Sequence, residues 1–420
     1  MTVREPAPPI ILEELDDAQV VALAGQYLTP NYRNAPLVFA GGEGAWNITT
    51  DGRRFLDFSA GVAVNALGHG HPDLVAAIRD QAGRLIHQSN YWHNSHAAPL
   101  AAELCRSFES ATDGSAARCF FSNSGAEAIE AAIKCARRYH ARVRGAARPA
   151  IITAWNSFHG RTWAAMSATA QAKYQDGFAP LVPGFRHADF GDIDSIAAQI
   201  DDEVGAVLIE VVQGEGGVHL PPPGFFVALR ELCDAHGLLL VLDEIQTGMG
   251  RTGTFFAFEQ EGIVPDIVTL AKALGGGVPI GAMLARAEVA QALQPGTHAS
   301  TFGANALACR AGRTVLAVYE RDALVARAAE LGALLIDELR AALSPRPWLV
   351  EVRGRGLMIG IEIDGEARDV VARAREKGLL LSIAGPRVLR FTPPLIVDAA
   401  QCRQAVRWLV EAADEVLGAV

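Results

Sequence analysis

Short apolar runs alternate with helical stretches over most of this chain, and this alternation limits what it can fold into. The strand-like runs lie at 118–122, 151–154, 205–212 and 238–242. Apolar residues at helical spacing occupy 72–86, 125–144 and 224–236. Strands that alternate with helices form βαβ units and a mainly parallel sheet. We therefore expect an α/β fold whose large domain has a mainly parallel central sheet flanked by helices.

The character of the sequence changes after about residue 312, where long helices rich in Ala, Arg, Leu and Glu begin. Strand-like runs at 350–363 and 388–392 interrupt them, which predicts a second, smaller α+β domain. Near the start, 44–49 and 54–58 are joined through Asp51-Gly52, a hairpin signal. We expect an N-terminal segment at 1–70 that packs with the small domain and a dimer partner, a large domain at 71–312 and a small domain at 313–420.

Composition excludes several classes of protein. The net charge of −10 argues against binding to nucleic acid, which needs clustered positive charge. No apolar run approaches the roughly 20 residues of a membrane span.

The six cysteines form no Cys-x-x-Cys pair, so we expect free thiols and a reducing cytoplasm. His87, His93 and His96 lack carboxylate or thiol neighbours, and we expect no metal site. Residues 1–9 lack an apolar signal core and predict a mobile leader.

Lys272 is one of only four lysines, and it lies in an apolar segment, 265–277, that ends in a glycine run. Burial of an amine disfavours its charged form, and a neutral lysine attacks carbonyl groups to form a Schiff base. The apolar strand at 238–242 ends in Asp243-Glu244. An acid in such a position can hold the ring nitrogen of a pyridoxal cofactor.

Asp243 has two other readings. An apolar strand that ends in acids also resembles the metal-holding acid of a nucleotide hydrolase, but that class needs a Gly-Lys-Ser/Thr loop. No lysine of this chain follows a glycine, so that interpretation fails. Asp243 as a structural cap of the next turn stays open.

Three further motifs follow strand ends. Small residues at 122–128 lead into a helix. The free N–H groups at its start, at Ser124, Gly125 and Ala126, would bind a phosphate. A helix cap without any ligand would show the same sequence pattern. In 157–162, Phe158 could stack on a flat cofactor and Arg161 could bind a carboxylate, or the segment is an ordinary surface loop. The glycine-rich 213–217 allows close approach of the backbone, as a turn also would.

In this order and spacing the motifs resemble the class III, fold-type I pyridoxal-phosphate aminotransferases over nearly the whole chain. The strongest matches are Leu240-Val-Leu-Asp-Glu-Ile-Gln-Thr-Gly-Met-Gly-Arg-Thr-Gly253 and Ala271-Lys-Ala-Leu-Gly-Gly-Gly-Val-Pro-Ile-Gly281. Within that class, the stretches 56–72, 158–180 and 390–395 are most similar to acetylornithine aminotransferases. Two departures lie at Tyr91-Trp92-His93-Asn94 and at Ala304-Asn305-Ala306, where the family more often has Gly-Asn-Pro.

The resemblance implies pyridoxal 5′-phosphate as cofactor and a role for each motif. Lys272 would carry the cofactor as an imine and shuttle the substrate proton, and Asp243 would pair with the ring nitrogen. The other implied contacts are Gln246 to the ring hydroxyl, Phe158 to the ring face, and Ser124, Gly125 and Ala126 to the phosphate. Thr301 would reach the phosphate from the neighbouring subunit, which implies a homodimer with shared active sites.

The implied reaction passes the terminal amine of N2-acetylornithine to 2-oxoglutarate, giving N-acetylglutamate 5-semialdehyde and glutamate, a step of arginine biosynthesis. Arg161 would bind the carboxylate remote from the reacting amine, and Arg390 the α-carboxylate of glutamate. Glu215 would pair with Arg390 when the terminal amine is bound. Ornithine, succinylornithine and 4-aminobutyrate aminotransferases, or a broad ω-transaminase, are the alternatives.

Overall fold

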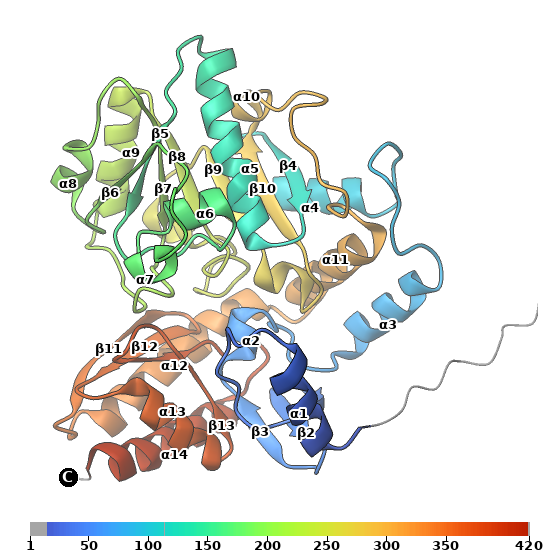
Figure 1. Ribbon diagram of the computed structural model, residues 1–420, viewed down its shortest axis with the longest axis vertical. Coiled ribbons are helices and arrows are strands. Elements are labelled where there is room, and N and C mark those ends of the chain that lie inside the picture. Colours follow the sequence, from blue (N-terminus) through green and yellow to red (C-terminus); the bar gives the residue numbers. More distant parts are fainter. Residues whose placement is uncertain (1–14, 113, 419–420) are drawn as a thin grey trace, which may run out of the picture.

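A seven-stranded sheet forms the centre of the computed structural model, which describes residues 15–112 and 114–418 (Figure 1). In sheet order the strands are β4 (Ala117–Ser122), β10 (Gly281–Arg286), β9 (Ile267–Leu270), β8 (Leu239–Asp243), β7 (Val204–Glu210), β5 (Ala150–Ala154) and β6 (Phe185–Ala188). Strand β10 runs antiparallel to both of its neighbours, and every other pair is parallel. The expected mainly parallel sheet is confirmed, and all strands except β10 end at the same edge.

Helices cover both faces of this sheet (Figure 1). Alternate residues of β8 point to opposite faces, as strand geometry requires. Leu240 and Leu242 belong to one hydrophobic cluster, whereas Leu239 and Val241 pack in a second cluster with helix α5. The helices up to the middle of the chain are α1 (Asp17–Tyr27), the short turn α2 (Ala60–Ala63), α3 (Pro72–Ala82), α4 (Ala97–Ala111), α5 (Gly125–Arg138), α6 (Trp163–Ala168), α7 (Ala172–Gln175), α8 (Ile193–Ala197) and α9 (Phe225–His236).

Two four-stranded sheets occupy the other half of the molecule. One has the order β11 (Leu349–Arg355), β12 (Met358–Ile363), β15 (Val388–Phe391) and β14 (Ser382–Ile383). The other has the order β1 (Phe39–Glu43), β2 (Trp46–Thr49), β3 (Arg54–Asp57) and β13 (Leu379–Leu380). Because β13 pairs with β3, the N-terminal strands lie beside C-terminal elements. The remaining helical segments are the 3-10 turns η2 (Ala257–Glu261) and η3 (Lys272–Gly275), then α10 (Ala287–Ala290), α11 (Ala306–Arg321), α12 (Leu324–Leu343), α13 (Ala367–Glu376) and α14 (Ala399–Leu417).

Most expected elements are present, with three differences in detail. The hairpin at 44–58 is confirmed as β2 and β3. The run at 350–363 is two antiparallel strands, because Gly356 takes a left-handed φ of 50° and turns the chain between them. The helix starting at Gly125 ends at Arg138 and continues as a π-helical turn, η1 (Tyr139–Val143). Helix α3 ends at Ala82, four residues earlier than expected.

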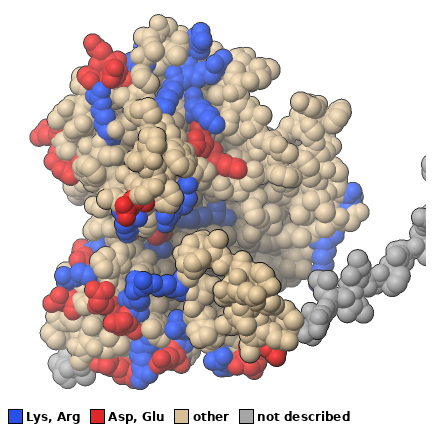
Figure 2. All heavy atoms as spheres, in the orientation of Figure 1, with Lys and Arg blue, Asp and Glu red and all other residues tan. Residues whose placement is uncertain are grey.

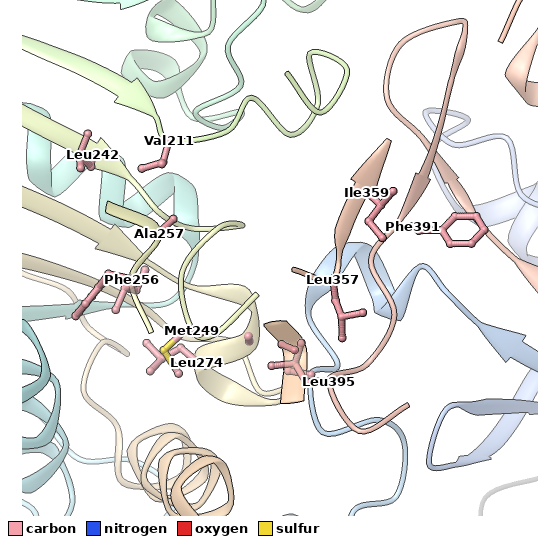
Figure 3. Packing of buried hydrophobic residues seen from close by; sticks show 14 of the residues in the cluster. Val211, Leu242, Met249, Phe256, Ala257, Leu274, Leu357, Ile359, Phe391 and Leu395 are labelled. Carbon is pink, nitrogen blue, oxygen red and sulfur yellow. The ribbon is translucent and has the colours of Figure 1, made fainter. Parts of the chain in front are cut away.

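A hydrophobic cluster joins the central sheet to the C-terminal sheet. Figure 3 shows Val211 and Leu242 on the side of the central sheet, Ile359 and Phe391 on the C-terminal strands, and Leu357 and Leu395 between them. All of these side chains are buried. The packing fixes the ends of the central strands against β12 and β15, and this is where the cavity described below lies.

None of the helices in the described ranges has the length and apolar character needed to cross a membrane. The same residues hold no group of three or more His, Cys, Asp or Glu arranged for a metal ion. The leader expected at 1–9 lies outside the described residues.

Candidate active site

The strand ends of the central sheet meet at a cavity of about 450 Å³. This volume is in the range of small-molecule sites. Nine of the eleven residues expected from the sequence line it: Ser124, Gly125, Ala126, Phe158, Arg161, Glu215, Asp243, Gln246 and Lys272. In the space-filling view a hollow separates the two halves of the molecule, and basic side chains lie inside it (Figure 2). The two remaining residues, Arg390 and Thr301, lie outside the lining.

Lys272 is separated from the end of β9 by Ala271 and has a φ of 47°, in the left-handed region that non-glycine residues rarely adopt. Strained backbone of this kind is common at functional sites. Burial lowers the pKa of Lys272 to about 8, with the Arg390 charge acting in the same direction and Glu215 opposing it. A substantial fraction of the amine is therefore neutral, and nucleophilic, slightly above neutral pH.

Asp243 is the last residue of β8 and is held from two sides. Its Oδ1 accepts a hydrogen bond from the backbone N–H of Ile245 at 3.0 Å. Its Oδ2 lies 2.8 Å from Nδ1 of His159, whose ring is fully buried. Since an ionised carboxylate only accepts, Nδ1 carries the proton of this contact. His159 orients Asp243 toward the cavity, and the sequence interpretation missed it, although it lies between Phe158 and Arg161 in a motif already singled out.

Glu210 is a second residue that the sequence interpretation missed. It ends β7 and stands in register with Asp243 on β8, so two buried carboxyl groups lie side by side. Its oxygens accept from the backbone N–H groups of Phe158 and Gly214, both at 3.2 Å. Burial raises the pKa of Glu210 to about 7, against the opposing effect of His159. Glu210 thereby ties two loops of the cavity to one strand end.

Arg390 lies behind the cavity and reaches it through Glu215. Nη1 of this buried arginine donates to Glu215 Oε1 at 2.5 Å and to Gln246 Oε1 at 3.2 Å. Its Nε donates to the hydroxyl of Ser382 at 3.1 Å. Burial by itself would raise the pKa of Glu215, but the charges of Arg390 and Lys272 outweigh it and hold that pKa below its usual value. The ion pair joins β15 of the C-terminal sheet to the glycine-rich loop at 213–217.

The N-terminus of α5 forms one wall of the cavity. Ser124 is the N-cap, and its hydroxyl accepts from the N–H of Glu127 at 3.2 Å, so the capping role considered for the sequence is present. A Cβ at Gly125 would lie 2.9 Å from the side chain of Ile245, which explains the glycine there. The free N–H groups of this helix start, together with its dipole, favour an anion in the cavity.

Thr301 is exposed and does not line the cavity of its own chain. It belongs to the loop before α11, next to Phe302, which is 60% exposed. Asn90 donates from its side chain to the carbonyls of Ser300 and Gly303, at 3.1 and 2.9 Å. The loop around Thr301 and the loop around Asn90 therefore form one surface.

Comparison with known proteins identifies relatives over nearly the full chain. A family model described as aminotransferase class-III matches residues 27–413. An acetylornithine aminotransferase of Caldanaerobacter subterraneus is 46% identical over 393 residues, which covers 93% of this chain and 98% of that protein. An ornithine aminotransferase from Toxoplasma gondii superposes with a TM-score of 0.91 at 36% identity, with 96% of each chain covered. An N-acetylornithine aminotransferase from Stenotrophomonas maltophilia gives a TM-score of 0.80 at 39% identity, with 95% and 100% covered.

Proposed function

This chain belongs to the class-III aminotransferases, and from that premise we propose that it transfers the terminal amine of N2-acetylornithine to 2-oxoglutarate. The products are N-acetylglutamate 5-semialdehyde and glutamate, which places the reaction in arginine biosynthesis. The observation that carries the proposal is the difference between two arginines of one site. Arg390 is paired with Glu215, whereas Arg161 forms no ion pair with any of the described residues.

Class-III aminotransferases use pyridoxal phosphate, and the residues at this site fit it. When bound, this cofactor supplies the carbonyl carbon that takes up the amine and the ring that accepts electrons. The start of α5 would hold the phosphate through the N–H groups of Gly125 and Ala126. Asp243 would hold the ring nitrogen, Gln246 the ring hydroxyl, and Phe158 one face of the ring. Gly125 and Ala126 both line the cavity at the start of α5, which supports this assignment.

Lys272 would act as the base of the reaction. Its Nζ would take the proton from the amine-bearing carbon of the substrate and return it at the cofactor. A base works best when its pKa lies near the operating pH, and burial brings the pKa of Lys272 to about 8. A positioned base of this kind contributes about 10²–10⁴-fold.

The two arginines would allow one site to bind two substrates whose reacting amines have different neighbours. Arg161 would bind the carboxylate remote from the reacting amine in both substrates. Glutamate carries a second carboxylate next to its reacting amine, which Arg390 would bind once Glu215 has moved away. Acetylornithine has no carboxylate next to its reacting amine. With this substrate Glu215 would stay paired with Arg390, so that the buried guanidinium keeps a partner of opposite charge.

A homodimer would complete each site. Tyr91, Trp92 and Phe302 are 89%, 68% and 60% exposed on the surface that contains Thr301. A cluster of exposed aromatic side chains marks an interface with another protein. We propose that this surface meets a second copy of the chain, so that Thr301 reaches the phosphate of the neighbouring subunit. The six free cysteines support a reducing compartment such as the cytoplasm.

The division into a segment at 1–70, a large domain at 71–312 and a small domain at 313–420 is part of the same proposal. The parallel pairing of β3 with β13 supports it, as does the contact between Trp46 and Trp408, whose rings lie 6.4 Å apart. Because Arg390 belongs to the small domain and Lys272 to the large one, the catalytic cavity would lie between them.

Ornithine is the second candidate donor, because the Toxoplasma gondii ornithine aminotransferase superposes at a TM-score of 0.91. A donor panel tests the choice: acetylornithine, ornithine, succinylornithine and 4-aminobutyrate, each with 2-oxoglutarate. We expect acetylornithine to give the highest kcat/KM. A higher kcat/KM for any of the other three would refute the assigned donor, and no transfer from all four would refute the aminotransferase assignment.

A further inference from the structure

Arg161 is exposed at the cavity and its guanidinium rests on an aromatic ring. The guanidinium carbon lies 4.0 Å from the ring centre of Tyr174 and 5.5 Å from that of Phe158. The two rings meet edge to face, with centres 5.6 Å apart. A guanidinium over an aromatic face at this distance is attracted by the ring quadrupole. Arg161 is therefore held by aromatic rings, with its N–H groups left for a ligand.

The ring of Tyr174 is itself fixed to the loop that carries Arg161. Tyr174 lies on α7, and Gln171, just before this helix, donates to the carbonyls of Asn156 and Ser157 at 3.1 and 2.9 Å. Gln175 donates to the carbonyl of Thr169 at 2.8 Å. The short helix is thus tied at both ends to backbone near the cavity, and the ring does not depend on its own hydroxyl, which makes no hydrogen bond with the described residues.

The backbone next to Arg161 is anchored separately by Glu130 of α5. This carboxylate accepts from the Thr162 hydroxyl at 2.8 Å and from the N–H of Ala164 at 3.0 Å. It therefore caps the start of α6 and ties the Arg161 loop to the helix whose N-terminus lines the cavity. With the backbone held by Glu130, the side chain of Arg161 has its direction set by Tyr174.

We propose that Tyr174 is a positioning residue that holds the Arg161 guanidinium ready for the remote carboxylate of both substrates. This inference rests on the proposed function, which gives Arg161 that carboxylate. A flexible arginine loses rotamer freedom on binding, and a guanidinium already held in place loses less. Lys173 also lies over this ring, with its Nζ 4.6 Å from the centre.

The test compares Tyr174→Leu with Tyr174→Phe, since phenylalanine keeps the aromatic face and leucine removes it. We expect Tyr174→Leu to raise KM for both acetylornithine and 2-oxoglutarate by about 3- to 10-fold, with kcat changed less than about 2-fold. Tyr174→Phe should stay within about 2-fold of the wild-type enzyme. Loss of kcat with unchanged KM, or an equal defect in Tyr174→Phe, would overturn the proposal.

Phe185→Leu is the matched control, because Arg137 lies over the Phe185 ring at 5.3 Å and neither residue lines the cavity. It removes the same kind of contact and should leave KM unchanged. In an Arg161→Gln background, Tyr174→Leu should cause no further rise in KM. A full additional rise there would show that Tyr174 acts by another route and would contradict the proposal.

Binding of glutarate to the holoenzyme, measured by calorimetry, separates this inference from the proposed reaction. Glutarate carries two carboxylates and no amine, so its affinity reports the carboxylate site without turnover. We expect Tyr174→Leu to weaken glutarate about 3- to 10-fold even if the wild-type enzyme fails with every donor of the panel. Equal glutarate affinity in the wild-type enzyme and Tyr174→Leu would refute the role of Tyr174, whatever the donor proves to be.

Discussion

Arg390 donates a hydrogen bond to Glu215 across the junction between the C-terminal sheet and the loop after β7. The arginine is 2% exposed, so its charge depends on a protein partner when no ligand carboxylate is present. Gln246 is its other partner at this junction, and Ser382 binds its far side. In the proposed reaction, this arrangement would let one cavity accept a substrate with an α-carboxylate and one without.

Glu215→Gln should therefore slow the half-reaction of acetylornithine by at least about 10-fold and that of glutamate by less than about 3-fold. In the proposed reaction, glutamate would bring its own carboxylate to Arg390, whereas acetylornithine would leave the arginine dependent on residue 215. Single-turnover rates from each substrate measure the two effects. Asp414→Asn is the control, since Asp414 pairs with Arg346 at 2.9 Å and neither residue lines the cavity. Equal losses in the two half-reactions would refute the proposed role of Glu215 as the alternative partner of Arg390.

The pKa of Lys272 predicts how the apoenzyme takes up its cofactor. The amine reacts when neutral, so the rate of covalent capture of pyridoxal phosphate should rise with pH and level off above about 8. Glu215 raises the pKa of Lys272, so Glu215→Gln should move that midpoint to lower pH. Stopped-flow absorbance of cofactor binding measures both profiles. A midpoint near 10.5, the ordinary lysine value, would contradict the argument.

His159→Leu should lower kcat by about 10- to 100-fold, because leucine has no N–H donor and the hydrogen bond that orients Asp243 is lost. A hydrogen bond to a charged group is worth about 1.5–3 kcal/mol, which corresponds to that range of rates. KM should change little, because His159 would touch neither substrate. Steady-state kinetics, together with the absorbance of the bound cofactor, check this. An unchanged kcat would show that Asp243 keeps its orientation without the hydrogen bond from His159.

Glu210 predicts a dependence of stability on pH. Its pKa in the folded protein is raised from 4.5 to about 7, so the folded state binds the proton more tightly than the unfolded chain. Folding stability should therefore fall as pH rises from about 4.5 to 7, by an amount on the order of 1–3 kcal/mol. Glu210→Gln should remove this part of the slope, as urea unfolding at pH 5 and pH 7.5 would show. An identical slope in both proteins would contradict the raised pKa.

Much of this fold follows from local sequence patterns. The alternation of strands and helices predicts the central sheet, and the strand ends then bring Asp243 and Lys272 to one edge, because β8 and β9 are neighbours. The Asp51-Gly52 turn predicts the β2–β3 hairpin for the same local reason.

Contacts between distant segments could not be predicted in this way. His159 meets Asp243 only because the loop after β5 extends past β7 to the end of β8, and nothing local to either residue encodes that path. The same is true of Tyr174, whose ring lies over Arg161 through the placement of α7. The parallel pairing of β13 with β3 joins segments from opposite ends of the chain. The turn between β11 and β12, in contrast, has a local signal in the sequence. Glycine readily takes the left-handed conformation of a tight turn, and Gly356 does so between the two apolar runs.

The most direct test of the proposed reaction follows the nitrogen atom. Holoenzyme is incubated with acetylornithine labelled with ¹⁵N at the terminal amine and with unlabelled 2-oxoglutarate, and glutamate is examined by mass spectrometry. The account predicts that the label appears in glutamate, one atom for each acetylglutamate semialdehyde formed, and that Lys272→Ala transfers none. Glutamate without the label, or transfer by Lys272→Ala at the wild-type rate, would contradict it.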